Sequence, residues 1–168
     1  AAILEQLHSI DTIVLDKTGT ITSGKPSVQG IKVYTNISTN DFISVAASLE
    51  RGSLHPLGQA IVEYAKDKNS KLQQPENFTN ISGRGIQAKL NGHVYLAGNK
   101  RLLEEKNIRI NQNVLSDLDA YASLGQTPLI FVEDQNVIGL ISVADTIRST
   151  SKVALEQFKQ KNMHVVML

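Results

Sequence analysis

The sequence contains no cysteine, which excludes both disulfide bonds and thiolate metal ligands. Its 168 residues carry 17 basic and 16 acidic side chains, for a formal net charge of +1, and no long run of one sign. This balance gives no electrostatic footprint for nucleic acid or an anionic membrane, so we expect no nucleic-acid partner. The four histidines are scattered without the spacing of a metal site, at His8, His55, His93 and His164.

Long hydrophobic runs are also missing. Stretches such as residues 137–144 fall far short of the ~20 residues that a membrane-spanning helix needs. The N-terminal stretch has no basic segment and is interrupted by Glu5, so it does not resemble a signal peptide. A hydrophobic fraction of 41% still allows a packed core, and we expect a soluble, monomeric protein. Because the sequence begins at Ala1 and ends in an apolar stretch, we expect it to be a piece of something longer.

The most informative stretch is residues 12–20, where TIVL precedes DKTGT. Four apolar or β-branched residues ended by a glycine-containing turn predict a buried strand with Asp16 at its carboxyl end. Open α/β sheets bind ligands at this edge, where Asp16 could act as a nucleophile toward phosphorus. Lys17 adds a cation, and Thr18 with the backbone near Gly19 could hold phosphoryl oxygens. The alternative is a solvated turn at a strand end, where these residue types are common.

The residue two positions after Asp16 separates two kinds of phosphoryl-transfer protein. Haloacid-dehalogenase-type phosphatases place a second Asp there as general acid/base, whereas this sequence has Thr18. Without that acid/base, an aspartyl phosphate should break down slowly, as suits an enzyme that changes conformation before the phosphate leaves. The run DKTGTIT accordingly resembles the phosphorylation motif of P-type ATPases.

The remaining pattern predicts an α/β protein in two parts. Residues 1–10 have helical spacing, and a turn is expected at residues 24–26. A helix near residues 153–158 and a strand at 164–168 again follow the strand–helix–strand order of a parallel sheet, as at the start of the sequence. In between, the pattern predicts strands at 28–34, 78–82, 85–90, 93–97, 127–133 and 137–143, helices at 41–51, 56–65, 99–106 and 114–124, and hairpin turns at 91–92 and 134–136. We therefore expect an antiparallel α+β domain, residues 24–143, inserted into a parallel α/β domain made of residues 1–23 and 144–168.

A second group of chemically informative residues lies in the inserted part. Glycines at strand ends let a flat ligand or a phosphate approach the backbone. A neutral imidazole can stack on a purine, and a carboxylate can accept a hydrogen bond from the exocyclic amine of the base. Taken singly, each feature also fits a helix cap or a β-bulge. The residues are Glu50, His55, Gly83, Gly85, Gly98 and Asn99.

Together with DKTGT, these features resemble the nucleotide-binding domain of heavy-metal-transporting P-type ATPases, which carries Ser-x-His-Pro-Leu, Gly-x-Gly and Gly-Asn motifs. The resemblance covers essentially the whole sequence. It implies that residues 24–143 bind ATP, with Glu50 on the adenine amino group, His55 orienting or stacking on the purine, and the glycines and Asn99 lining the site. It also implies that residues 1–23 and 144–168 are a partial haloacid-dehalogenase-like, Rossmann-like phosphorylation domain, in which ATP phosphorylates Asp16 and Mg²⁺ binds Asp16 and the carbonyl of Thr18.

The resemblance further implies a transmembrane metal-transport domain and an actuator domain in the same full-length protein, on whose cytoplasmic side this part would lie. Asp145 and Arg148 match an Asp-x-x-Arg element at the return to the phosphorylation domain; an exposed helix start is the alternative. Gly98-Asn99 and the Val-Val-Met-Leu ending favour export of copper(I), although Leu54 stands where copper members usually have Glu.

Alternatives to a copper pump are a zinc, cadmium or cobalt pump of the same family, a stand-alone haloacid-dehalogenase-type phosphatase, and a non-catalytic ATP-binding module. The family's phosphate-binding Lys and its Gly-Asp-Gly loop are not in the sequence. We therefore expect this stretch alone to be incomplete for turnover.

Overall fold

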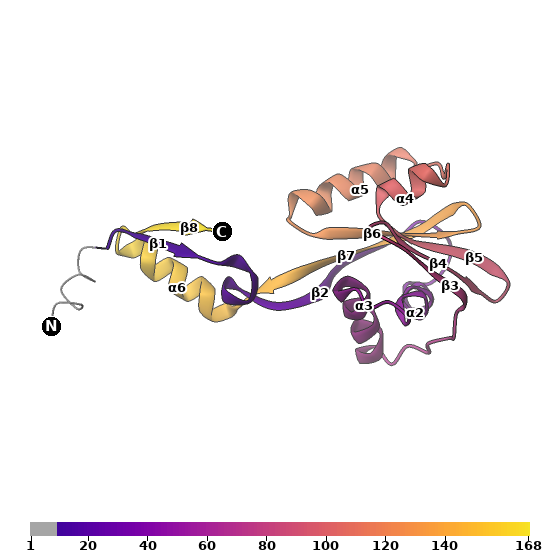
Figure 1. Cartoon of the computed structure of the whole chain (residues 1–168), viewed down its shortest axis with the longest axis horizontal. Coiled ribbons are helices and arrows are strands. Elements are labelled where there is room, and N and C mark those ends of the chain that lie inside the picture. Colours follow the sequence, from indigo (N-terminus) through magenta and orange to yellow (C-terminus); the bar gives the residue numbers. More distant parts are fainter. Residues whose placement is uncertain (1–9) are drawn as a thin grey trace. The chain divides into compact units, whose positions relative to one another are not determined.

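The computed structural model describes residues 10–168, so the helix expected at residues 1–10 lies almost wholly outside the described residues (Figure 1). The chain divides into two compact units. The second unit is Pro26–Ala144, and the first consists of what precedes and follows it, described over residues 10–25 and 145–168. Each unit is built from its own strands and helices.

In the first unit, β1 (Thr12–Leu15) pairs in parallel with β8 (His164–Met167). Their register runs from Thr12 opposite His164 to Leu15 opposite Met167. Helix α6 (Ser149–Gln160) precedes β8 (Figure 1). Parallel strands require a crossover connection, which α6 helps to provide. The expected parallel pairing of the first and last strands is confirmed.

The second unit is built on a six-stranded sheet in the order β2-β7-β6-β5-β4-β3. From β3 to β7, neighbouring strands are antiparallel, as the hairpin signals predicted. Residues 22–25 of β2 and 145–147 of β7 belong to the first unit. The strands are β2 (Thr22–Val33), β3 (Glu76–Ile81), β4 (Gly85–Leu90), β5 (His93–Gly98), β6 (Thr127–Glu133) and β7 (Asn136–Ile147).

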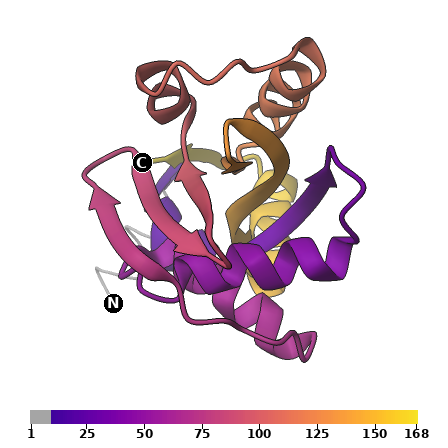
Figure 2. The same ribbon diagram turned by 90° about the vertical axis from the view of Figure 1, so that its right-hand side faces the viewer.

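Helices cover both faces of this sheet, α2 (Thr39–Glu50) and α3 (Pro56–Asp67) on one side and α4 (Lys100–Glu105) and α5 (Gln112–Ser123) on the other (Figures 1 and 2). Side chains that alternate along β6 supply the two cores. Phe131 packs edge-on against Phe42 of α2, with ring centroids 5.5 Å apart. Its neighbours Ile130 and Val132 join the core beneath α4 and α5. The helices are therefore held by apolar burial on both sides of the sheet.

Turn and cap chemistry explains where these elements begin and end. Ser38 caps α2 by accepting from the amide of Asp41, and Pro56 occupies the first turn of α3, where its missing N–H costs nothing. Asn91 and Gly92 have φ values of 52° and 85°, which a type I′ hairpin turn requires. The predicted β4–β5 hairpin is therefore confirmed.

The prediction of a turn at residues 24–26 is wrong, because β2 runs without a break from Thr22 to Val33. Pro26 cannot donate a ladder hydrogen bond, but β2 is the edge strand of the sheet and has a neighbour on one side only. Gly24 takes a φ of 73° without ending the strand. A proline that reads as a breaker in sequence is thus accommodated at the sheet edge.

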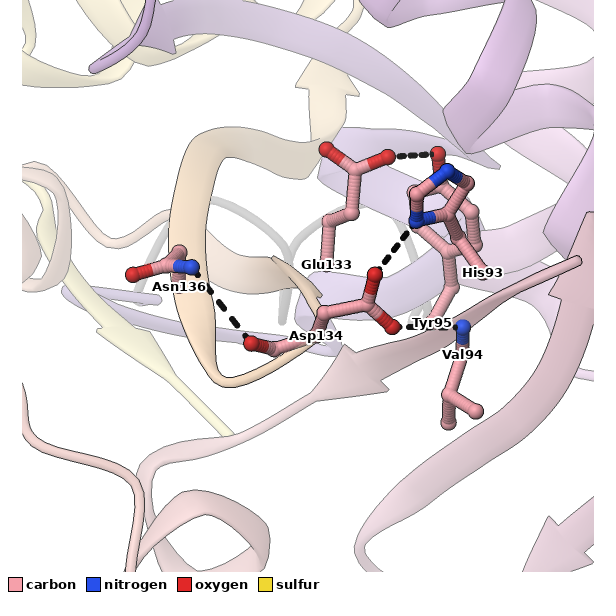
Figure 3. Close-up of polar contacts among 6 residues, drawn as sticks. All are labelled: His93, Val94, Tyr95, Glu133, Asp134 and Asn136. Carbon is pink, nitrogen blue, oxygen red and sulfur yellow. Dashed lines mark hydrogen bonds and ion pairs between the residues drawn. The ribbon is translucent and has the colours of Figure 1, made fainter.

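A polar cluster ties the β4–β5 hairpin to the β6–β7 turn (Figure 3). The Asp134 carboxylate contacts Nδ1 of His93 and accepts from the amide of Val94 at 2.9 Å. Beside it, the Tyr95 hydroxyl donates to Glu133. Asp134 raises the pKa of His93 above its usual value. In turn, His93 and the Val94 amide lower the pKa of Asp134. The cluster joins two turns that are 40 residues apart in sequence.

Candidate functional site

Asp16 follows the last residue of β1, as the sequence predicted for the candidate nucleophile. It begins an irregular turn over Lys17–Ile21, and its exposed carboxylate makes no capping hydrogen bond to that turn. Gly19 adopts a φ of +79°, a left-handed conformation that favours glycine. The amide of Lys17 donates to the carbonyl of Leu168 at 3.1 Å, which fixes the start of the turn to the end of the chain. The carboxylate is thereby presented at the carboxyl edge of a parallel strand pair.

Arg148 holds the far end of the same turn. Its Nη2 donates to the carbonyl of Gly19 and its Nε donates to the carbonyl of Thr22, both at 3.0 Å. Its backbone amide donates to the carbonyl of Ile21 at 3.0 Å. A planar guanidinium with several fixed donors suits this arrangement, since it can satisfy two carbonyls at once. Arg148 therefore fixes the backbone that follows Asp16.

Asp145 completes this support from the end of β7. It accepts from the hydroxyl of Thr22, from Ser23 Oγ at 3.0 Å and from the amide of Gly24 at 3.2 Å. These donors, Thr22 foremost, lower the pKa of Asp145. In the sequence, Asp145 and Arg148 stand out only as part of a family element. Their contacts span more than 120 residues, so no local pattern could reveal them.

The oxygen donors expected to bind Mg²⁺ are Asp16 and the carbonyl of Thr18. Within residues 10–168 no group of three or more acidic or histidine side chains is placed to hold a metal. Mg²⁺ commonly uses one or two carboxylates and completes its shell with water and substrate phosphates. The exposed carboxylate of Asp16 is compatible with a magnesium ion that is brought in with a phosphate ligand.

The second unit contains a cavity of about 290 Å³ that gathers most of the other predicted residues. This volume is close to the lower end of the ~300–1,000 Å³ typical of small-molecule sites. Its lining mixes polar side chains such as Ser53, Asn80 and Thr127 with the apolar surface of Ile81, Ile86 and Leu129. The predicted residues in the lining are Glu50, His55, Gly83, Gly85 and Asn99.

Gly98 is the predicted residue that does not line this cavity. A Cβ at Gly98 would lie 2.2 Å from the carbonyl oxygen of Arg84, and one at Gly85 would lie 2.1 Å from that of Ala97. The two glycines face each other in the β4–β5 register, so the close approach of these strands requires both. For Gly98 the structure thus shows a packing role, and its part in nucleotide binding stays a prediction.

Glu50 is the last residue of α2, and only 5% of its surface is exposed. Burial raises its pKa to about 7, and a hydrogen bond with the side chain of Ser53 partly offsets this effect. A Cβ at Gly58 of α3 would lie 2.2 Å from Oε2 of Glu50. The carboxyl group of Glu50 is therefore buried in close contact with the first turn of α3.

His55 is the N-cap of α3, and its Nδ1 accepts from the amide of Leu57 at 3.2 Å. With Nδ1 accepting, the proton of the neutral ring is on Nε2. Pro56 follows at the first helical position and fixes the backbone there. The helix-cap explanation of His55 thus holds, and it leaves the exposed ring available to a ligand.

Asn99 links the glycine turn to α4. Its Oδ1 caps α4 by accepting from the amide of Leu102 at 3.2 Å, and its Nδ2 donates to the carbonyl of Gly83 at 3.1 Å. Gly83 has a φ of +69°, and a Cβ there would meet no atom within 4 Å. Glycine is therefore favoured at this position by the backbone conformation and not by crowding. Asn99 therefore shapes the turn that walls the cavity.

A second, more open cavity of about 670 Å³ shares Ser82, Gly83 and Arg84 with the first. Its charged lining is balanced, since Arg84 pairs with Glu105 at 2.9 Å and Lys100, on the same helix, pairs with Glu104 at 3.8 Å. The walls are formed by Ser82, Gly83, Arg84, Arg101, Glu104 and Glu105. We assign the site to the smaller cavity because it collects the buried carboxyl group and the exposed imidazole.

A profile of the haloacid dehalogenase-like hydrolase family matches residues 10–168. The chain belongs to this family. A copper-exporting P-type ATPase of Staphylococcus epidermidis is 41% identical over 165 residues, which are 98% of this chain and 20% of that protein. The chain thus spans about a fifth of the length of the curated relatives that it matches.

Solved structures agree with this family assignment. A zinc-transporting PIB-type ATPase is 32% identical, with a TM-score of 0.84 over 99% of this chain and 26% of its own. The catalytic domain of a CPx-ATPase that was studied for its conformational changes upon nucleotide binding is 25% identical, with a TM-score of 0.68 over 99% of this chain and 56% of its own. The resemblance to heavy-metal P-type ATPases and the expected haloacid-dehalogenase-like fold are confirmed. No helix in residues 10–168 is long and apolar enough to cross a membrane.

Proposed function

We propose that this chain is the ATP-binding and phosphorylation part of a P-type ATPase that exports a heavy-metal cation, copper(I) foremost. The observation that carries the proposal is the cavity in which Glu50, His55, Gly83, Gly85 and Asn99 meet, although they come from three separate stretches of sequence. The names of the staphylococcal relatives favour copper. The zinc-transporting structural neighbour keeps a zinc pump as the second candidate.

The cavity supports binding of the nucleoside part of ATP. Glu50, at its buried end, can accept a hydrogen bond from the amino group of adenine. The imidazole of His55, held by its cap contact with Leu57, can stack on or orient the base. Gly83 and Gly85 present backbone without side chains, which leaves room for the ribose and phosphates. The residues assigned to ATP are these four, with Asn99 holding the turn.

Phosphoryl transfer is assigned to Asp16 with Lys17 and Thr18. A carboxylate oxygen of Asp16 attacks the γ-phosphorus, the bond to the oxygen bridging the β- and γ-phosphorus breaks, and ADP leaves with that bond's electron pair. The products are an aspartyl phosphate and ADP. Mg²⁺, held by Asp16 and the Thr18 carbonyl, would neutralise charge on the phosphoryl oxygens. Arg148 and Asp145 keep the backbone from Gly19 to Gly24 in place during the attack.

The rest of the proposal concerns the whole transporter. It includes a transmembrane domain that carries the metal and an actuator domain that later acts on the phosphoenzyme, with this part on the cytoplasmic side of the membrane. Thr18 replaces the acid/base of the phosphatases, which favours a long-lived aspartyl phosphate over simple hydrolysis. That residue disfavours the stand-alone phosphatase.

Calorimetric titration of the 168-residue chain with ATP tests the binding step. We expect saturable binding that is little changed by Asp16→Asn, because Asp16 belongs to the other unit, and weakened at least tenfold by His55→Ala. The matched control is Gln59→Ala, an exposed neighbour on α3 that does not line the cavity. Equal affinity in wild type and His55→Ala would remove His55 from the site.

Labelling from γ-labelled ATP tests the transfer step in membranes that carry the whole transporter. An acid-stable, hydroxylamine-sensitive label is expected on the wild type and absent from Asp16→Asn. The nearby Asp11→Asn serves as control, since Asp11 precedes β1. Label that survives Asp16→Asn would overturn the assignment of the nucleophile while leaving the ATP cavity untouched.

A further inference from the structure

The protonation state of Glu50 decides which hydrogen bonds the cavity can offer to a base. An ionised carboxylate only accepts hydrogen bonds, whereas a neutral carboxylic acid both donates and accepts. The Watson–Crick edge of adenine presents one donor, the N6 amine, next to one acceptor, N1. A carboxylate facing that edge would satisfy the amine but set its second oxygen against the lone pair of N1. A neutral acid would satisfy both.

The surroundings of Glu50 favour the neutral form. Its carboxyl group is almost fully buried, and within residues 10–168 it forms no ion pair. The polar partner recorded for it is the hydroxyl of Ser53, itself bound by the amide of His55 at 3.2 Å. Removing a charge from water without a counter-charge is costly, and a carboxyl in such a place protonates instead.

The other charged or titratable groups lining the cavity come from elements that face α2. They are His55 at the start of α3 and Arg84 in the turn between β3 and β4. Neither contributes to the altered pKa of Glu50, whose causes are burial and Ser53 alone. Arg84 is paired with Glu105, which lines the larger cavity and not this one. The carboxyl group is therefore not held ionised by a neighbouring cation.

Gly58 fixes where this acid can lie. There is no space for a Cβ between residue 58 and Oε2 of Glu50, so α3 bounds the space around the Glu50 carboxyl group on one side. The carboxyl group also lines the cavity, where a bound base can reach it. A carboxyl group matches the adjacent donor and acceptor of adenine when one of its oxygens carries a proton. A buried acid kept neutral to donate a hydrogen bond is an established device in enzyme sites.

From this geometry we infer that Glu50 recognises adenine as a neutral carboxylic acid, donating to N1 and accepting from the N6 amine, so that ATP binding takes up a proton at alkaline pH. This inference rests on the proposed ATP site and specifies how its base is read. Glu50 is then a residue that contacts the Watson–Crick edge of the base directly and whose protonation sets the strength of that contact.

The test compares wild type with Glu50→Gln in calorimetric titrations with ATP from pH 6 to pH 8. The side-chain amide of Gln donates and accepts like the neutral acid but does not titrate. Wild type should bind ATP about tenfold more weakly at pH 8 than at pH 6, relative to Glu50→Gln, and should take up close to one proton per ATP at pH 8 in buffers of different ionisation enthalpy. Glu50→Gln should bind at pH 8 at least as tightly as wild type and take up no proton.

Two controls isolate Glu50. The terminal phosphate of ATP also titrates, with an ordinary phosphate pKa near 6, but this affects both proteins equally. Histidine as a residue type changes charge in this range, so the proton count is repeated on His55→Gln, where the uptake should persist. The wild-type proton count needs no variant and so does not depend on how any variant folds.

Two results would overturn the inference. If Glu50→Gln binds ATP at least tenfold more weakly than wild type at pH 8 and wild type takes up no proton, the carboxylate is the binding form. If the proton uptake persists in Glu50→Gln, the proton is bound elsewhere. Absence of ATP binding in every protein tested would instead contradict the proposed ATP site itself.

Discussion

The guanidinium of Arg148 donates from Nη2 to the carbonyl oxygen of Gly19 at 3.0 Å, across 129 positions of sequence. With a second bond to the carbonyl of Thr22, it fixes the turn that presents Asp16. A nucleophile must be held in a defined geometry for rapid reaction, and this contact holds its backbone without touching the carboxylate. Arg148 is in this sense a positioning residue.

Replacing Arg148 by Met should loosen the turn without unfolding the protein, because the side chain is exposed and its loss leaves carbonyls that water can reach. We expect amide hydrogen exchange at Gly19–Thr22 to accelerate at least tenfold, while exchange in the sheet of the second unit stays unchanged. Arg109→Met, an exposed arginine of the second unit, is the matched control. Unchanged exchange in this turn would contradict the positioning role.

Asp145 should make the same turn sensitive to acid. Its pKa is lowered in the folded protein, so its hydrogen bonds stabilise the fold above the ordinary aspartate pKa and are lost as pH falls through the lowered value. In Asp145→Asn this acid-side loss should disappear, at the cost of a weaker turn near neutral pH. A two-dimensional NMR titration of Gly24 and Ser23 amides checks both expectations. Identical acid titrations in wild type and variant would show that Asp145 carries no such linkage.

The pairing of His93 with Asp134 predicts a pH effect of the opposite sense (Figure 3). The pKa of His93 is raised, so the stabilisation is fully present below the ordinary histidine pKa and disappears as pH rises through the raised value. Asp134→Asn should return the NMR-measured pKa of His93 toward its ordinary value. Asp119→Asn, an exposed carboxylate on α5, should leave it in place. A His93 pKa that ignores Asp134→Asn would show that the pair does not form in solution.

Burial of the Glu50 carboxyl group should lower the stability of the folded protein at neutral pH. Its pKa rises from the ordinary value to about 7, so the folded state loses stability as pH increases from about 4.5 to 7 and stays at the lower level above. The loss corresponds to about 3 kcal/mol in free energy of unfolding, at 1.36 kcal/mol for each pKa unit. Glu50→Gln should remove most of this slope and be more stable than wild type at pH 8. Urea unfolding at pH 5 and pH 8 measures it, and equal slopes in both proteins would contradict the burial argument.

Gly58→Ala should displace the Glu50 carboxyl group by steric overlap. The added Cβ would meet Oε2 of Glu50 at 2.2 Å, and overpacking of this kind costs about 1–3 kcal/mol. Removing the obstructing side chain with Glu50→Ala should make the second change, Gly58→Ala, close to neutral. Gln59→Ala, one position along α3 and exposed, serves as control. A thermal-unfolding double-mutant cycle with purely additive effects would show that the two residues do not share the space.

The fold was predictable from the sequence because the signals for its strands and turns are local. Asn91-Gly92 marks a hairpin, and the residues from Thr12 to Leu15 mark a strand, through chemistry that neighbouring residues settle among themselves. The turn expected at residues 24–26 was wrong because the effect of Pro26 on a strand depends on the neighbouring strands. On an edge strand the missing N–H of proline need not leave a carbonyl unpaired.

Five of the residues predicted for the nucleotide site line one cavity, but their physical surroundings could not be predicted. Resemblance named Glu50 and His55, but neither the burial of Glu50 nor its contact with Gly58 can be read from spacing, because α2 and α3 must first pack. Gly98 faces Gly85 across the β4–β5 pair, and this close approach of two strands also cannot be read from spacing. Arg148 and Asp145 bridge more than 120 residues, beyond any periodic pattern.

Nuclear magnetic resonance mapping of ATP binding to the 168-residue chain tests the central claim most directly. We predict saturable amide shifts that are largest at Glu50, His55, Gly83, Gly85 and Asn99, with Gly92 and Asn107, which lie outside the cavity lining, unmoved. Shifts concentrated instead at Arg101 and Glu104 would place the nucleotide in the larger, open cavity. No saturable shift at millimolar ATP would contradict the account of this chain as the ATP-binding part of a metal pump.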